Sequence, residues 1–223
     1  YYGEPRPDYL LVWLHGDVSK GGPADYHFRY AEQFVQQNPD LSVGSVGMLR
    51  PGYPDSKGNY SSVGPGNEGR LDSYTLDNIR EVAAAVDYLK DKHQVEHVIL
   101  IGHSGGAAIS AVILSDSPDT ASGAILVACP CDLVTWVNGR DVFKRSENPL
   151  DWVEGITPDT PIVAITGEKD NNTFSELGRI YVAAARQQGA NAHFREAAKA
   201  DHNNVMVNSL VGSSIRWMIE QLQ

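Results

Sequence analysis

The sequence predicts an α/β fold in which a mostly parallel sheet of about six strands is covered by helices on both faces. Apolar runs alternate along the chain with segments whose apolar residues have helical spacing. The runs lack apolar–polar alternation, as expected for strands buried on both faces of a parallel sheet. With 223 residues, 42% of them hydrophobic, the chain can bury one substantial core, so a single domain over residues 1–223 is expected.

The first elements follow from short apolar runs and from prolines. Residues 9–14 form a nearly continuous apolar run, which predicts the first strand. Pro23 opens a helix that ends before Pro39, and residues 42–49 form the next strand. A polar loop rich in Gly, Pro and Ser then covers residues 50–73. A helix is predicted next from the spacing of Leu76, Ile79, Val82, Ala83, Val86 and Leu89.

The middle of the chain repeats the strand–helix pattern once and then becomes irregular. The apolar run at 98–101 predicts a strand, and the small and apolar residues at 107–114 predict a helix. Residues 123–128 form another buried strand. Residues 129–159 are irregular, and at about 30 residues they can form a small cap insertion but no separate lid domain.

The last third supplies two more strands and two helices. Residues 161–166 read as a buried strand, and 192–196 as a shorter one. A helix between them runs through residues 174–184, with Gly189 as its C-terminal cap. A closing helix is expected over residues 205–222.

The most specific motif is Gly102-His103-Ser104-Gly105-Gly106, which lies between the strand at 98–101 and the helix at 107–114. A G-x-S-x-G sequence in this context predicts a nucleophile elbow, a tight turn that exposes the serine hydroxyl above a sheet. The flanking glycines allow such a turn because they carry no Cβ atom. Ser104 is therefore the candidate nucleophile.

A serine nucleophile needs a base to take its proton and a carboxylate to orient that base. Asp170 ends the tight turn Gly167-Glu168-Lys169-Asp170 after a strand, and His202 lies in the loop Asp201-His202-Asn203 after a later strand. The order Ser104, Asp170, His202 is the order of an α/β-hydrolase triad. Asp132, which follows the strand at 123–128, is the alternative acid.

These motifs together resemble the α/β hydrolases, near the esterase and prolyl-oligopeptidase-like branch. The matching segments are Leu14-His15-Gly16-Asp17, Arg50-Pro51-Gly52-Tyr53, Gly102-His103-Ser104-Gly105-Gly106, Gly167-Glu168-Lys169-Asp170 and Asp201-His202. The resemblance implies a Ser104–His202–Asp170 triad, and an oxyanion hole built from the backbone N–H groups of Gly105 and Asp17. Many esterases carry several glycines after the His-Gly pair, whereas here Asp17 follows, so the second donor is placed at Asp17 or within a residue or two of it. The Asp17 carboxylate is expected to cap a turn or to point away from the site.

Loops at the carboxyl ends of the strands are expected to line the substrate pocket. The candidate pocket residues in or beside these loops are Tyr53, His103, Trp136 and Trp152. For the two tryptophans, a pocket role and simple packing of the 129–159 segment on the sheet are both open.

Composition and the remaining motifs exclude several classes of function. A net charge of −10 argues against nucleic acid and anionic membranes, and no apolar run approaches the ~18–20 residues of a membrane span. The G-x-G-x-x-G at 64–69 follows no apolar strand, and the H-x-x-E-H at 93–97 runs out of its helix, so neither a nucleotide site nor a zinc site is predicted.

The two cysteines, Cys129 and Cys131, flank Pro130 and have no zinc or C-x-x-C spacing. They are expected to be reduced thiols, which favours a reducing compartment. A soluble protein is expected, with the cytoplasm slightly favoured over export.

The main functional hypothesis is a serine esterase that cleaves small-molecule carboxylic esters through an acyl-enzyme, without a metal or organic cofactor. A serine peptidase or aminopeptidase of the prolyl-oligopeptidase-like branch is the alternative within the enzymes. A non-catalytic hydrolase-like binding module is the alternative outside them, although such modules usually lose a member of the triad.

Overall fold

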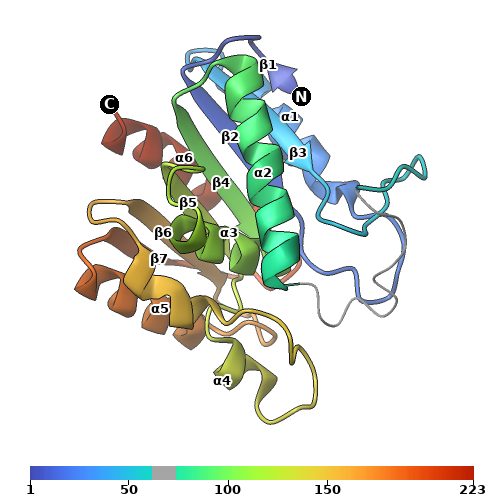
Figure 1. The fold of residues 1–223 in the computed structure, drawn as a ribbon, viewed down its shortest axis with the longest axis vertical. Coiled ribbons are helices and arrows are strands. Elements are labelled where there is room, and N and C mark those ends of the chain that lie inside the picture. Colours follow the sequence, from blue (N-terminus) through green and yellow to red (C-terminus); the bar gives the residue numbers. More distant parts are fainter. Residues whose placement is uncertain (62–73) are drawn as a thin grey trace.

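The computed structural model describes residues 1–61 and 74–223 of the chain (Figure 1). Part of the expected 50–73 loop and the whole 64–69 motif lie outside the described residues. The described part contains a seven-stranded sheet in the order β1-β3-β2-β4-β5-β6-β7. The strands are β1 (Tyr2–Gly3), β2 (Tyr9–Leu14), β3 (Val43–Met48), β4 (His97–His103), β5 (Gly123–Val127), β6 (Pro161–Gly167) and β7 (Asn191–Ala197).

The sheet confirms the predicted α/β-hydrolase fold class and adds one strand. All neighbours from β3 to β7 pair in parallel, and the extra strand β1 pairs antiparallel with the edge strand β3. β1 has only two residues, Tyr2 and Gly3, so no apolar pattern marks it in the sequence.

Helices cover both faces of the sheet, as expected. The helices α2, α3 and α5 share a core with one face, and α1 and α6 share a core with the other. Figure 1 shows α2 and α3 in front of the strands and α6 behind them. The helices are α1 (Phe28–Gln37), α2 (Leu76–His93), α3 (Gly105–Asp116), α4 (Leu133–Val137), α5 (Ser175–Gln187) and α6 (Ser209–Gln221), with 3₁₀ turns at Asp25–His27, Pro149–Gly155 and Val205–Val207.

The two cores explain why a central strand such as β2 is apolar along its length. In β2, Leu10, Val12 and Leu14 pack in the core under α2, α3 and α5, whereas Leu11 and Trp13 pack in the core under α1 and α6. Successive side chains of a strand point to opposite faces, so a strand with helices on both sides needs apolar residues throughout. Among the helices of the described residues, none combines the length and the apolar character needed to cross a membrane.

The closing helix begins later than the sequence suggests. A 3₁₀ turn occupies Val205–Val207, and α6 starts at Ser209. The Asn208 side chain accepts a hydrogen bond from the Leu210 N–H at 3.0 Å, which is the geometry of a helix N-cap.

The expectation of free thiols at Cys129 and Cys131 is wrong. The two sulfur atoms are bonded, and the two Cα atoms lie 5.0 Å apart, within the range that a disulfide spans. An extended chain would hold residues two apart at about 6.6–7.2 Å. The chain instead bends after β5, where Ala128 has a φ of 50°. The argument for a reducing compartment therefore loses its basis.

The strand order places a crevice at the carboxyl ends of β2 and β4. The chain leaves β2 through α1 to reach β3 on one side, and later returns through α2 to β4 on the other side. Ligands of open α/β sheets bind at such a switch point. The residues after β2 begin with His15, and the residue after β4 is Ser104.

The turn from β4 into α3 depends on very close backbone packing. A Cβ atom on Gly102 would lie 2.4 Å from the Gly106 carbonyl oxygen. A Cβ atom on Gly106 would lie 2.5 Å from the Leu14 oxygen and 2.6 Å from the His15 oxygen. The N-terminus of α3 can therefore approach the end of β2 only with glycine at these positions.

We expect Gly106→Ala to destabilise the fold, because the new methyl group meets backbone atoms that cannot rotate away. Overpacking of this kind lowers the free energy of unfolding by about 1–3 kcal/mol. In a protein of this size, each kcal/mol lowers the Tm by roughly 2–4 °C. The matched control is Gly212→Ala in α6, where a Cβ atom meets nothing within 4 Å. Alanine is about 1 kcal/mol better than glycine inside a helix, so this variant should be at least as stable as the wild type. Equal thermal unfolding of both variants would contradict the packing argument.

Candidate active site

Ser104 lies at the junction of β4 and α3 in a backbone conformation that few side chains adopt. Its φ is 51° and its ψ is −117°. The turn is fixed from both sides, since the Ser104 N–H donates to the Val127 oxygen at 2.8 Å and the Ala107 N–H donates to the Ser104 oxygen at 2.9 Å. Strained conformations of this kind persist where the surrounding structure holds them, and they are common at functional sites.

The structure brings the side chains of Ser104, His202 and Asp170 together from the ends of three different strands. His202 Nε2 is 3.2 Å from Ser104 Oγ, and His202 Nδ1 is 2.9 Å from Asp170 Oδ2. The Asp170 side chain is fully buried, whereas the His202 side chain keeps 17% of its surface exposed. With Nδ1–H donating to the carboxylate, Nε2 is left as the acceptor that faces the serine hydroxyl.

The loop after β6 prepares the Asp170 carboxylate to act as an acceptor. Oδ1 accepts from the N–H groups of Asn172 and Thr173, both at 2.9 Å, and Oδ2 accepts from Thr173 Oγ1 at 2.9 Å as well as from His202. Burial raises the pKa of Asp170, but the hydrogen bond and charge of His202 and these N–H donors outweigh burial and lower it below its ordinary value. The carboxylate is therefore ionised at neutral pH. Thr173 was not identified from the sequence.

Asp132, the alternative acid, has a different task in the structure. Its carboxylate accepts from the Thr135 N–H at 3.1 Å and from Thr135 Oγ1 at 2.5 Å, and so caps α4. The structure places Asp170, and not Asp132, against His202. Asp201, beside the base, accepts from the N–H groups of Asn203 and Asn204 and stabilises its own turn.

The loop after β2 presents backbone N–H groups beside Ser104. The Gly16 N–H donates to the Tyr26 hydroxyl at 2.7 Å. By contrast, the N–H groups of Asp17 and Gly105 donate to no other group in the part of the chain that the structure describes. This pattern leaves Asp17 and Gly105 available as the two oxyanion donors that the resemblance implies.

The Asp17 carboxylate, which the sequence predicts to cap a turn or to point away from the site, is held in a buried network. It forms an ion pair with the buried Arg50, with 2.8 Å between Asp17 Oδ1 and Arg50 Nη1, and it also accepts from the hydroxyls of Tyr53 and Tyr74. A Cβ atom on Gly105 would lie 2.7 Å from Asp17 Oδ1, so this network lies directly behind the elbow. Tyr53, expected in the pocket, is completely buried in the network.

A second network connects the loop that carries Gly16 and Asp17 to the loop that carries His202. His103 Nε2 is 2.9 Å from the His202 carbonyl oxygen, which can only accept, so Nε2 carries the proton. In the neutral ring Nδ1 is then an acceptor, and the Tyr26 hydroxyl donates to it at 2.6 Å while accepting from the Gly16 N–H. Burial, together with the charge of His202, lowers the pKa of His103 to about 4, which keeps the ring neutral. His103 is thus a support for His202 rather than part of the pocket wall.

A cavity of about 380 Å³ opens in front of Ser104 and His202. The segment after β5 supplies Trp136, Arg140, Val142 and Phe143 to its wall, and other loops supply Asp17, Ser19, Asn172 and Asn203. Trp136, for which the sequence left a pocket role and packing on the sheet both open, lines this cavity and also packs against the core. Trp152 lies elsewhere, because it packs on the core beside α3 and donates to Glu147 Oε2 at 3.1 Å. Within the described residues, no three His, Cys, Asp or Glu side chains are grouped so that they could hold a metal ion.

Sequence comparison identifies one family. The model of the family described as serine aminopeptidase, S33, matches residues 54–193, which is more than half of the chain. The match includes Ser104 and Asp170 and excludes His15 and His202. No curated protein sequence matches the chain.

Solved structures with the same fold cover almost the whole chain at low identity. Est1E from Butyrivibrio proteoclasticus, solved with ferulic acid bound, has a TM-score of 0.68 at 14% identity over 98% of this chain and 91% of that one. The Pyrococcus furiosus esterase Pf2001 has a TM-score of 0.63 at 18% identity, with 96% and 84% of the two chains covered. TT1662 from Thermus thermophilus has a TM-score of 0.70 at 13% identity, with 96% and 90% covered. At these sequence identities, the similarity shows that the proteins share a fold.

We predict that the two candidate acids differ sharply when each is replaced by its amide. Asp170→Asn removes the acceptor that holds His202 in its working tautomer, so kcat on p-nitrophenyl butyrate should fall by up to about 10⁴-fold. Asp132→Asn is the matched control, because asparagine also caps a helix and should change kcat by less than about threefold. The opposite ranking would assign the orienting role to Asp132.

We also predict that Tyr26→Phe lowers kcat about tenfold with little change in KM. Without the hydroxyl, the Gly16 N–H and His103 Nδ1 lose their buried partner, and the loops of the oxyanion hole and the base are no longer tied together. Tyr30→Phe is the control, since among the described residues the Tyr30 hydroxyl accepts from Arg29 and makes no hydrogen bond with Gly16 or His103. The measurement is steady-state kinetics well below the Tm of each variant, and an unchanged kcat for Tyr26→Phe would contradict the positioning role.

Proposed function

The chain belongs to the serine aminopeptidase (S33) family of α/β hydrolases, and we propose that within it this protein hydrolyses carboxylic esters through a Ser104 acyl-enzyme. The observation that carries the proposal is the chain of contacts from Ser104 Oγ to His202 Nε2 at 3.2 Å and from His202 Nδ1 to Asp170 at 2.9 Å, at the wall of an open cavity.

The proposed reaction has two halves. Ser104 Oγ attacks the ester carbonyl carbon while His202 Nε2 takes the hydroxyl proton, and the tetrahedral intermediate collapses as His202 returns that proton to the departing alcohol. Water then adds to the acyl-enzyme with His202 again as base, and the carboxylic acid leaves. Asp170 keeps its negative charge throughout and stabilises the imidazolium that forms in each half.

Stabilisation of the oxyanion is assigned to the N–H groups of Asp17 and Gly105. Each tetrahedral intermediate places a negative charge on the former carbonyl oxygen, and two fixed donors stabilise that charge without rearranging. The ion pair of Asp17 with Arg50 supports this role, because it neutralises a carboxylate that would otherwise oppose the oxyanion.

The charges of the cavity favour an ester over a peptide with a free N-terminus. An aminopeptidase must hold the ammonium group of its substrate, usually with a carboxylate. Among the described wall residues, Asp17 is the one carboxylate, and Arg50 already neutralises it. The other full charge on the wall is Arg140, which repels an ammonium group. The family description still makes aminopeptidase activity the second candidate.

A panel of p-nitrophenyl esters and aminoacyl-p-nitroanilides tests the proposal. We expect the wild type to hydrolyse the esters and to leave the anilides intact, and Ser104→Ala to lower ester turnover by about 10³-fold or more. A fluorophosphonate should label Ser104, identified by mass spectrometry of the tryptic peptide. Thermal unfolding checks that Ser104→Ala remains folded.

The other outcomes point to the alternatives. Anilide turnover that exceeds ester turnover would select the aminopeptidase. Turnover of neither class, without labelling of Ser104, would favour a non-catalytic module. Ester turnover that survives Ser104→Ala at more than a few per cent would remove Ser104 as the nucleophile.

A further inference from the structure

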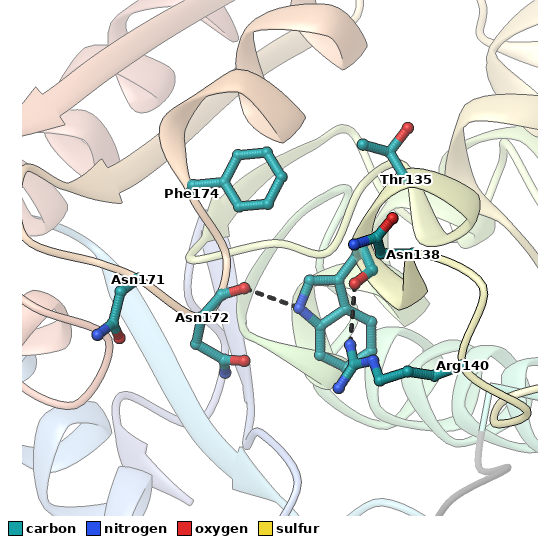
Figure 2. Close-up of a pocket in the computed structure, with 7 residues that line it drawn as sticks. Thr135, Asn138, Arg140, Asn171, Asn172 and Phe174 are labelled. Atoms are coloured by element: carbon teal, nitrogen blue, oxygen red, sulfur yellow. Dashed lines mark hydrogen bonds between the residues drawn. The ribbon is translucent and has the colours of Figure 1, made fainter.

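A second hollow of about 450 Å³ lies beside the catalytic cavity and is lined mainly by polar groups. Figure 2 shows Asn171, Asn172 and Phe174 on one side and Asn138 and Arg140 on the other. The first side is the loop that follows Asp170, and the second is the end of α4 and the turn after it.

The two hollows adjoin. Trp136, Arg140 and Asn172 line both of them. Trp136 Nε1 donates to the Asn172 carbonyl oxygen at 2.8 Å, and this hydrogen bond forms part of the shared wall. A substrate held at Ser104 can therefore extend past Trp136 into the second hollow.

The side-chain amides of Asn138, Asn171 and Asn172 make no hydrogen bond within the described residues, and all three residues are exposed. Each amide offers two N–H donors and a carbonyl acceptor. A hydroxyl group both donates and accepts, so several hydroxyls on one ligand would match three free amides around one hollow. Simple alkyl alcohols carry no such set of groups.

The other residues of the hollow fit the same kind of ligand. Phe174 is 40% exposed, and Trp136 also lines the hollow, so apolar surfaces are available for the C–H faces of a sugar ring. The Arg140 guanidinium is held in place, since it donates to the carbonyl oxygens of Val137 and Trp136, both at 2.9 Å, and lies 5.4 Å from the Trp136 ring. A fixed guanidinium adds directed donors for ligand oxygens.

We propose that this hollow binds the hydroxyl-rich alcohol, a sugar or polyol, of an ester whose carbonyl carbon lies at Ser104. The acyl group then occupies the part of the catalytic cavity formed by Val142 and Phe143. The protein's net charge of −10 favours a neutral hydroxylated group over an anion. This inference rests on the ester hydrolysis proposed above.

The test compares kcat/KM for 6-O-butyryl-glucose and ethyl butyrate, which share an acyl group. We expect the wild type to prefer the sugar ester at least tenfold. Asn171→Ala and Asn138→Gly should each reduce this preference about two- to tenfold, the usual effect of one hydrogen bond. Glycine is used at position 138 because the native φ is 48°, which alanine would resist. Gln36→Ala, which removes an exposed amide on α1, is the control and should leave the preference unchanged.

Two results of this comparison would overturn the inference. One is a wild-type preference near unity, or one that neither variant reduces. The other is a preference for carboxymethyl butyrate, whose alcohol part carries the negative charge, over 6-O-butyryl-glucose that disappears in Arg140→Gln, because the hollow would then be a site for an anion.

A binding measurement separates this inference from the proposed reaction. We expect methyl β-glucopyranoside, titrated into ¹⁵N-labelled protein, to shift the side-chain NH₂ signals of Asn138 and Asn171 and not that of Gln36. If no ester is hydrolysed but these shifts occur, the esterase proposal fails and the sugar site stands. The glycoside is titrated up to about 100 mM, because weaker binding would be of little use to an enzyme. If esters are hydrolysed and none of these signals shifts over that range, the sugar site is overturned and the esterase proposal stands.

Discussion

The buried ion pair between Arg50 and Asp17 is the interaction on which the arrangement of the site depends. Arg50 is only 1% exposed, and a buried charge is costly unless a partner of opposite charge compensates it. Although burial opposes ionisation, Asp17 raises the pKa of Arg50, so the guanidinium stays charged. Asp17 follows β2 and Arg50 follows β3, and the Tyr74 hydroxyl, just before α2, also donates to Asp17. These contacts together fix three segments of the chain behind the turn that carries Ser104.

Neutral histidines extend this fixed arrangement through the rest of the site. His15 bridges the Gly16 carbonyl oxygen and the Arg50 N–H, and burial lowers its pKa well below the ordinary value. His27 places its two ring nitrogens 3.1 and 3.0 Å from the Ala24 and Met48 carbonyl oxygens, and burial lowers its pKa to about 4, so the one N–H of the neutral ring donates to one of these oxygens. With His103 they act as hydrogen-bonding supports, which leaves His202 as the partly exposed imidazole at Ser104. Burial and neighbouring groups thus distinguish these three histidines from His202, the candidate base.

One short loop connects the catalytic contacts to the second hollow. Between β6 and α5, the N–H groups of Asn172 and Thr173 hold Asp170, while the Asn172 carbonyl oxygen accepts from Trp136 and the side chains of Asn171 and Asn172 line the hollow. The backbone of the loop and the Thr173 side chain therefore hold Asp170, whereas the side chains of Asn171 and Asn172 are available to a ligand. This division explains how the chemistry and the substrate preference of such a site can vary independently.

The sequence by itself determined the α/β class and the six longer strands, and it singled out Ser104, Asp170 and His202 as candidates, because each of these residues lies in a short turn or loop after a segment that reads as a strand. It left Asp132 open as the acid, since both carboxylates follow strands and only the folded chain shows which one meets His202. The tertiary structure alone showed that Tyr26 contacts His103, that Arg50 pairs with Asp17 and that Thr173 donates to Asp170. It alone also showed the disulfide between Cys129 and Cys131 and the position of Trp136 beside Ser104. The physical reason is that periodicity and turn chemistry are local, whereas a hydrogen bond such as that between Tyr26 and His103 joins groups 77 residues apart that meet only when the sheet orders its strands.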